Sequence, residues 1–480
     1  METQPQLQAA PVERDHRWTA LVVIAVAQLM VALDATVVNI ALPTAQHSLD
    51  FSDGDRAWVV TAYTSALAGL LLLGGRCADR FGRRRAFLTG LVGFAASSAL
   101  AGAAPWFGVL VAGRALQGVF AALLTPTALS LIAVTFTNGK ERAKAFGVYG
   151  AVASSGAAVG LLLGGILTEY AGWRWCLYVN VVVAIAAFVV ARRVLPQSDG
   201  FADTPVDALS GVLVTTGLAT IVFGCAEAAT HGWRSGVVLG ALAVGLVAVA
   251  LFLVRQHRLE RPVLPLWVLT DGARAGAYLS VAVAVVGSFG MFLMLTYHFQ
   301  VVLGWSPVRT GLAFLPLSAA VTAGSYGLGS RLLPRVAPRV LIVPGLLVAA
   351  SGLFLLAGLS ADSAYLFRIL PAEVLLGVGM GCVFTPAISV ATTGIDMRYA
   401  GVTAATATTF MQVGGSVGTA ALNSIAVSAT AAVASSAGAG PVALVHGFAV
   451  ATTWSGGILM VAALAAAALV RTPRPTHHGK

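Results

Sequence analysis

Apolar runs of about twenty residues recur along nearly the whole chain, separated by short turns that are charged or rich in Gly and Pro. A helix needs about 20 such residues to cross a lipid bilayer. Only 10% of the 480 residues are charged and 58% are hydrophobic, whereas about a quarter of the residues of a soluble domain are charged. The sequence therefore predicts an all-α membrane protein that crosses the bilayer many times.

The apolar runs divide the chain into fourteen predicted spans. They cover residues 18–42, 57–76, 86–104, 107–135, 145–169, 175–194, 208–228, 235–254, 276–302, 310–330, 340–360, 365–391, 400–430 and 447–470. The first span differs from a cleaved signal peptide because it is long, contains Asp34 near its middle and lacks a small-residue cleavage site after a short apolar core. We therefore predict that it is retained.

The positive charges predict how the spans are oriented, because Lys and Arg concentrate in cytoplasmic turns. With the N-terminus inside, most of the 29 Lys and Arg residues lie on the cytoplasmic side. The exceptions are Arg56, Arg174, Arg234, Arg309 and Arg368 in outside turns and Arg114 within a span. Both termini are therefore predicted to be cytoplasmic. Because the bases lie in short turns and not on a basic soluble domain, nucleic acid is excluded as a partner.

A dense charge cluster, GRCADRFGRRR at residues 75–85, lies between the second and third spans. Such a cluster cannot lie in hydrocarbon, so it predicts a tight cytoplasmic turn between two membrane helices. Gly75 and Gly82 would allow the sharp bend, and Asp79 and Arg80 would pair or cap a helix end.

The pattern G-R-x-x-D-R-x-G-R-R in this cluster resembles the loop between helices 2 and 3 of major facilitator superfamily transporters. Other runs resemble one branch, the fourteen-span drug:proton antiporters of the EmrB/QacA type. These runs are LDATVVNIALP at 33–43, GRALQG at 113–118, WRW at 173–175 followed by Asn180, and QVGG at 412–415. The likeness extends over roughly residues 17–470.

The resemblance implies proton-driven export of lipophilic, cationic drugs or natural products across the cytoplasmic membrane of a bacterium. Two six-helix bundles would alternate around a central cavity. The implied organisation is a tail (1–17), a bundle (18–194), an inserted two-helix hairpin (208–254), a second bundle (276–470) and a second tail (471–480). A weak internal repeat supports it, because Arg331, Arg335 and Arg339 repeat the spacing of Arg76, Arg80 and Arg84.

The resemblance also assigns a mechanical role to the charge cluster, because in the family this loop latches the cytoplasmic halves together. That role would fall to Gly75, Asp79, Arg80, Gly82 and Arg83. The alternative is that the bases only anchor the loop on the cytoplasmic side.

The fifth span departs from the family's antiporter signature, because Leu161 stands where proline is usual. Its glycines remain, and small residues at such spacing allow another helix to approach closely. These are Gly156, Gly160, Gly164 and Gly165. The departure leaves open an alternative function, an importer or facilitator of a small organic solute on the same fold.

Asp34 and Arg114 are the predicted proton-coupling residues. A carboxylate near mid-membrane costs about 2.5–3.5 kcal/mol even on the most lenient scale, so such residues usually serve an ion or a substrate. Arg114 cannot lose its charge and needs a partner, for which Asp34 is a candidate. The alternatives are an Asp34 bound to Asn39 or to helix backbone, and a purely structural pair.

Asn39, Gln117, Glu373 and His298 are predicted candidates for the wall of a substrate cavity. Glu373 lies well inside its span, whereas Glu227 is predicted to lie on a solvated face near the outer interface. His298 titrates near neutral pH, but a lone histidine beside Tyr297 and Gln300 is also typical of a packed residue at the interface.

Catalytic and nucleotide-binding motifs are missing from the sequence, which contains no HExxH, Walker A or GxSxG run and no clustered metal ligands. The prediction is therefore a transporter and not an enzyme, without metal or cofactor, driven by a proton gradient. Its expected partners are protons, a lipophilic small molecule and the bilayer, and it is expected to function as a monomer.

Overall fold

The structure, a computed structural model, describes residues 14–136, 139–196, 207–259, 262, 264–333, 335–360, 363–392, 397–437 and 440–470. Within these ranges the chain is almost entirely helical and contains no strand. This agrees with the predicted all-α class and with the physics of the bilayer, where a helix satisfies its own backbone hydrogen bonds. Helix α1 already begins at Arg14, while the predicted tail 471–480 lies outside the described residues.

The elements follow the apolar runs. The first long helices are α1 (Arg14–Leu49), α2 (Trp58–Phe81), α3 (Arg83–Gly102), α4 (Phe107–Thr135), α5 (Gly139–Tyr170) and α6 (Trp175–Val194). Then come α7 (Ala208–His231), α8 (Gly236–Arg258) and the short α9 (Trp267–Thr270). The rest comprises α10 (Gly272–Tyr297), α11 (Pro307–Ala313), α12 (Leu315–Thr322), α13 (Ser330–Leu332), α14 (Pro338–Ala357), α15 (Leu370–Thr392), α16 (Met397–Ala437) and α17 (Pro441–Leu469).

Four short irregular helices complete the fold. A 3-10 turn, η1 (Asp55–Ala57), leads into α2, and the π-helical turns are η2 (His298–Val302), η3 (Ala323–Gly329) and η4 (Tyr365–Ile369). Such turns often mark functional positions in helices. The segment from α11 to α13 is interrupted at Phe314, two residues before Pro316, because proline cannot donate a backbone hydrogen bond to the preceding turn.

Twelve helical spans in the described part are long and apolar enough to cross a membrane. They correspond to twelve of the predicted spans, so the chain is a multi-pass membrane protein. The other two predicted spans match α2 and α5, which are 24 and 32 residues long. Over their described residues, these two helices do not meet the combined criteria of length, hydropathy and low charge that the twelve spans meet. The number fourteen therefore stays a prediction.

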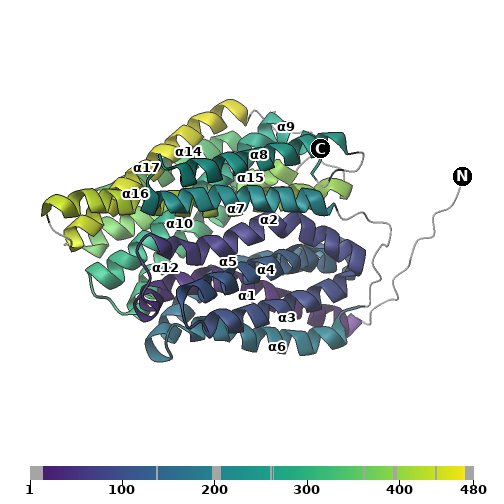
Figure 1. The fold of residues 1–480 in the computed structure, drawn as a ribbon. Coiled ribbons are helices and arrows are strands. Elements are labelled where there is room, and N and C mark those ends of the chain that lie inside the picture. Colours follow the sequence, from purple (N-terminus) through teal and green to yellow (C-terminus); the bar gives the residue numbers. More distant parts are fainter. Residues whose placement is uncertain are drawn as a thin grey trace, which may run out of the picture.

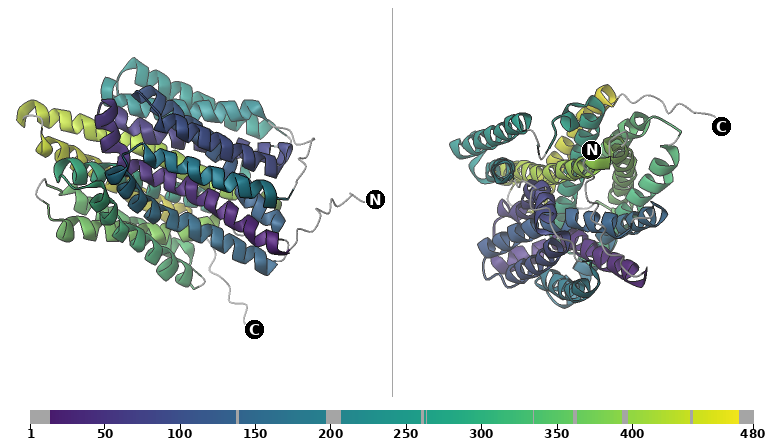
Figure 2. Two further views of the ribbon diagram at one scale, coloured as in Figure 1. Left: turned by 90° about the horizontal axis from the view of Figure 1, so that it is seen from below. Right: turned by 90° about the vertical axis from the view of Figure 1, so that its right-hand side faces the viewer.

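The helices form two groups joined by α7 and α8. In Figure 1 the first six helices, purple to blue, lie below, and α14 to α17, green to yellow, lie above. Within the lower group α1 packs against α5 and α2 against α4; within the upper group α10 packs against α16 and α14 against α15. Helix α7 lies beside both groups, in contact with α2 and α16, which also contact each other (Figures 1 and 2). The exact boundaries of the two bundles stay a prediction.

The glycines of α5 lie where other helices approach most closely. Gly160 and Gly164 face α1 at Thr36 and Val37, and Gly156 faces Ala32. Gly165 faces the backbone of Pro307 in α11, so this position joins the two helix groups. At Leu161, the position of the missing proline, the carbonyl group lies against Gly311 of α11. Helix α5 is unbroken in the described structure.

We expect Gly165→Ala to destabilise the protein, because an added Cβ would lie 2.7 Å from the carbonyl oxygen of Pro307. Overpacking of this kind typically costs about 1–3 kcal/mol. The measurement is the thermal unfolding temperature of the purified protein in detergent. The matched control is Gly240→Ala in α8, where a Cβ would meet nothing within 4 Å. An equal unfolding temperature for both variants would contradict the prediction.

Candidate functional site

Asp34 lies in the middle of α1 at a point where helices of the first group meet. Its side chain is 0% exposed. The guanidinium Nη1 of Arg114, on α4, donates to Asp34 Oδ2 at 2.5 Å. Gln117 Nε2 and Asn180 Nδ2 donate to the other oxygen, Oδ1, at 3.0 Å and 2.7 Å. Three donors and one positive charge therefore surround the carboxylate, as a buried charge requires.

Arg114 is buried as completely as its partner, at 1% exposure. Its Nε donates to the carbonyl oxygen of Val59 at 3.0 Å, and Nη1 also donates to Gln117 Oε1 at 2.9 Å. The guanidinium lies 4.5 Å from the centre of the Tyr63 ring, a cation–π contact that stabilises a desolvated cation. Val59 and Tyr63 thus connect α2 to the site.

The local sequence explains this convergence. Arg114 and Gln117 are three residues apart on α4, and residues at that spacing lie on the same helix face. Gln117 Nε2 also donates to Ser98 Oγ on α3 at 2.6 Å. The site therefore contains side chains from α1, α2, α3, α4 and α6, and we call Asp34, Arg114, Gln117 and Asn180 the polar cluster.

The polar cluster contains three residues singled out in the sequence and one that was not. Asp34, Arg114 and Gln117 were candidates, whereas Asn180 appeared only as part of a motif. Asn39 lies outside the cluster, because its Nδ2 donates to the carbonyl oxygen of Ala35 at 3.1 Å. The alternative in which Asp34 binds Asn39 is therefore wrong. Residues five apart on a helix do not share a face.

The charge cluster at 75–85 differs from the predicted loop. Helix α2 continues to Phe81, α3 begins at Arg83, and the whole turn is Gly82 with φ 93°. Gly75 therefore lies within α2, facing Pro126, and placing it in the bend was wrong. The positive φ of Gly82 is one that glycine adopts without strain.

The bases of this cluster contact neighbouring segments. Arg84 donates to the carbonyl oxygen of Arg192 at the end of α6, and Arg76 Nη2 donates to that of Pro262 at 3.4 Å. The guanidinium of Arg80 lies 5.9 Å from the Phe81 ring, and Arg83 opens α3. The side chain of Asp79 lies outside the described part, so the latch role of these residues stays a prediction.

The remaining candidates lie apart from the polar cluster. Glu227 is partly exposed near the end of α7, and its Oε2 lies 3.0 Å from His231 Nδ1. His298 begins η2 and is 0% exposed, so it is buried inside the protein. Neither of its ring nitrogens has a hydrogen-bond partner among the residues that the structure describes. Glu373, in the first turn of α15, is also 0% exposed and lies beside Tyr365.

Arg56 lies in the predicted turn between the first two spans, but its burial there was not predicted. It was assigned to an outside turn, but in η1 it is only 1% exposed. Its Nε donates to Asn423 Oδ1 on α16 at 2.7 Å, and its guanidinium lies 4.4 Å from the centre of the Tyr297 ring on α10. Arg56 therefore joins the first helix group to two helices of the second.

Further hydrogen bonds connect the two groups. Ser416 Oγ donates to Thr64 Oγ1 at 2.6 Å, and Gln300 Nε2 donates to the carbonyl oxygen of Ile40 at 2.9 Å. With Arg56 and Asn423, these contacts hold α1 and α2 against α10, η2 and α16.

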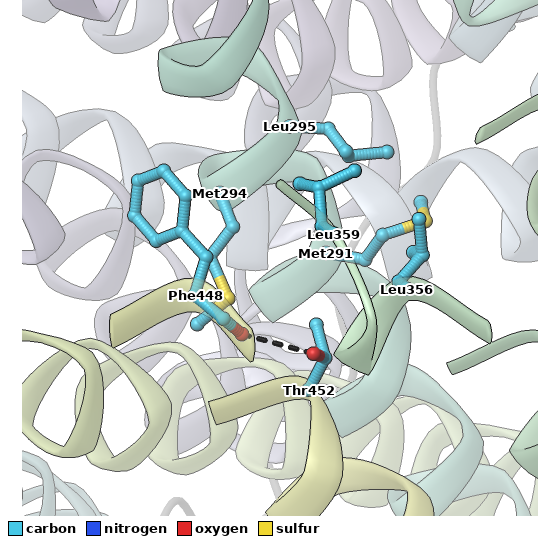
Figure 3. Close-up of a pocket in the computed structure, with 7 residues that line it drawn as sticks. All are labelled: Met291, Met294, Leu295, Leu356, Leu359, Phe448 and Thr452. Atoms are coloured by element: carbon cyan, nitrogen blue, oxygen red, sulfur yellow. Dashed lines mark hydrogen bonds between the residues drawn. The ribbon is translucent and has the colours of Figure 1, made fainter. Parts of the chain in front are cut away.

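A small apolar cavity lies beside this contact zone, among α10, α14 and α17 (Figure 3). Its lining consists of Met291, Met294, Leu295, Leu356, Leu359, Phe448 and Thr452. The cavity has room for about one water molecule. The hydroxyl of Thr452 donates to the carbonyl oxygen of Phe448 at 2.9 Å, so its hydrogen is used within the helix and the surface offered by the cavity is apolar.

Comparison with known proteins agrees with this architecture. A sequence profile of the Major Facilitator Superfamily matches residues 24–419. The chain is 47% identical to the puromycin resistance protein pur8 of Streptomyces alboniger, over 98% of this chain and 96% of that protein. It is 36% identical to the cephamycin export protein CmcT of Amycolatopsis lactamdurans, over 86% of this chain and 85% of that protein. It is 35% identical to the multidrug efflux pump LfrA of Mycolicibacterium smegmatis, over 85% of this chain and 80% of that protein.

Solved structures show the same fold at low identity. The POT family transporter PepTSo has a TM-score of 0.69 at 16% identity, over 96% of this chain and 98% of that one. The TM-score is 0.66, at 17% identity, for a bacterial homologue of the human lysosomal transporter Spinster in an inward-facing and unoccupied conformation. This match covers 95% of this chain and 97% of that one. Sequence profile, relatives and fold agree: the chain belongs to the Major Facilitator Superfamily and is a multi-pass membrane transporter, not an enzyme.

Proposed function

We propose that this protein exports lipophilic, cationic natural products or drugs across the cytoplasmic membrane of a bacterium in exchange for protons. The names of its relatives, which describe resistance to puromycin, export of cephamycin and multidrug efflux, support export as the direction of transport. In this proposal both termini are cytoplasmic, the protein works as a monomer, and no cofactor takes part.

The observation that carries the proposal is the buried pair of Asp34 and Arg114, joined at 2.5 Å with exposures of 0% and 1%. Arg114 keeps its charge at any physiological pH. If Asp34 took up a proton in this arrangement, Arg114 would be left as a buried cation without a counter-ion, which costs several kcal/mol. Proton uptake by Asp34 is therefore favourable only together with a rearrangement that solvates or re-pairs Arg114.

This linkage is what an exchanger needs. A proton that arrives at Asp34 favours a conformation in which the polar cluster opens, and loss of the proton favours the closed cluster. A cationic substrate would take the place of Arg114 beside the carboxylate, so that substrate and proton compete for one group. Alternating access of the two helix groups then exchanges one for the other.

The test is transport by the purified protein in proteoliposomes, with puromycin and a lipophilic cationic dye as probes. We expect each probe to accumulate against its gradient when the lumen is acidic, to release protons from the lumen, and to lose accumulation when a protonophore is added. A facilitator or importer would instead move the probe downhill at a rate independent of the pH gradient. That result would overturn proton exchange while leaving transport itself in place.

A further inference from the structure

A second buried carboxyl group, that of Glu373, has surroundings opposite in character to those of Asp34. Its side chain is 0% exposed, and its Oε1 has no hydrogen-bond partner within the described part of the chain. Among the described residues no Lys, Arg or His forms an ion pair with it. An isolated ionised carboxylate in such a place is very unfavourable, whereas the neutral acid can be buried at moderate cost.

Among the described residues, one polar group contacts Glu373, and it is arranged to suit the neutral acid. The hydroxyl of Tyr365, in η4, donates to the carbonyl oxygen of Ala313 at 2.7 Å and lies 3.4 Å from Glu373 Oε2. A phenol has a single hydrogen. The hydroxyl is placed to donate to either oxygen, but it can serve only one, and Ala313 is nearer. With its hydrogen on Ala313, the phenol oxygen can accept a hydrogen bond from a protonated Glu373 and offers nothing to a carboxylate.

Among the described side chains, the elements packed against α15 supply no compensating charge. These are α10, α12, α14, α16, η3 and η4. Their described ionisable side chains, with His298 next to α10, are Arg274, Tyr278, Tyr297, His298, Tyr326, Arg339, Tyr365 and Arg368. Of these, only Tyr365 contacts the carboxyl group, and the guanidinium of Arg368 lies against Gly358. Residues 397–405 of α16 have side chains outside the described part.

We propose, resting on the proton exchange described above, that Glu373 is a second proton-binding site of the transport cycle, occupied in the conformation seen here. In this conformation Glu373 holds a proton, whereas Asp34 is paired with Arg114, so each helix group contributes an exchangeable carboxyl group. On release, the O–H bond of Glu373 breaks, the proton passes to water that enters as the protein opens, and a carboxylate remains. The Tyr365 hydroxyl then turns its hydrogen from Ala313 to this carboxylate and stabilises it.

The first experiment needs no transport and uses the full-length protein in a detergent without ester groups, because ester carbonyls absorb close to protonated carboxyl groups. A protonated carboxyl group has an infrared carbonyl band that is separate from those of carboxylates and amides. We expect this band at neutral pH in the wild type and in Asp34→Asn, and its loss in Glu373→Gln. In Tyr365→Phe the band should shift, because the carboxyl group loses its acceptor. The matched control is Glu227→Gln, which should keep the band, and a band that persists unchanged in Glu373→Gln would overturn the proposal.

The second experiment counts protons released per puromycin transported in proteoliposomes. We expect Glu373→Gln to halve this ratio and to keep accumulation, because Asp34 still exchanges its proton. An unchanged ratio in Glu373→Gln would refute a role for Glu373 in the cycle while leaving proton exchange intact. A wild type that releases no protons would instead refute the proposed function, and the infrared result would still report the protonation of Glu373.

Discussion

Asp34→Asn is expected to abolish accumulation of substrate against its gradient, because asparagine can neither take up nor release a proton. The substitution also removes the counter-ion of Arg114, which is 1% exposed. Removing one member of a buried ion pair typically costs about 3–5 kcal/mol, so the variant should unfold at a lower temperature as well. The measurement is accumulation of puromycin in proteoliposomes under an imposed pH gradient, beside the unfolding temperature.

Two further variants separate lost coupling from lost stability. Asp50→Asn makes the same chemical change at an exposed position with φ 50°, which asparagine readily adopts. It should leave both the accumulation of puromycin and the unfolding temperature unchanged. The double variant Asp34→Asn with Arg114→Gln removes both charges. It should recover much of the lost stability without recovering accumulation. Accumulation at the wild-type level in either Asp34 variant would rule out Asp34 as the proton carrier.

Arg56→Ala should destabilise the closed contact between the two helix groups. The variant loses a charged hydrogen bond to Asn423 at 2.7 Å, of a kind that contributes about 1.5–3 kcal/mol. It also loses the cation–π contact with Tyr297, which contributes about 2 kcal/mol when desolvated. We expect a loss of roughly 3 kcal/mol in the free energy of unfolding, measured by thermal or denaturant unfolding in detergent.

Arg234→Ala is the matched control for this prediction. Arg234 lies exposed in the turn between α7 and α8, so removal of its charge should change stability by only a few tenths of a kcal/mol. Asn423→Leu provides an independent check, because it removes the acceptor and leaves the guanidinium in place. If Arg56→Ala were as stable as Arg234→Ala, the contact with Asn423 and Tyr297 would contribute nothing measurable.

Much of the architecture was predictable because the bilayer restricts what the chain can do. Long apolar runs must become helices, and a charge within such a run is so unfavourable that Asp34 and Arg114 stand out without any structural information. Gln117 was accessible too, because its spacing from Arg114 places both on one helix face. These signals are local, and each can be recognised within a single run.

What could not be predicted depends on contacts between distant segments. An uncharged amide such as Asn180 has no unusual cost in an apolar run, so nothing marked it as a ligand of Asp34. Arg56 lies in a short polar turn, and its burial results from Tyr297 and Asn423, which are far away in the sequence. The turn at Gly82 was misjudged for another reason: a helix can continue into water beyond the membrane, so the end of α2 does not coincide with the end of its apolar run.

The position of α7 has a consequence for how the protein meets lipid. Because α7 packs against both α2 and α16, it covers the line along which these helices of different groups meet, and acyl chains are excluded from that line. Where α5 meets α11 and α12, the α7–α8 hairpin does not intervene. In the part of the chain that the structure describes, the two flanks are therefore unlike, and an oily molecule dissolved in the bilayer would meet a junction that α7 and α8 leave uncovered where α5 contacts α11 and α12.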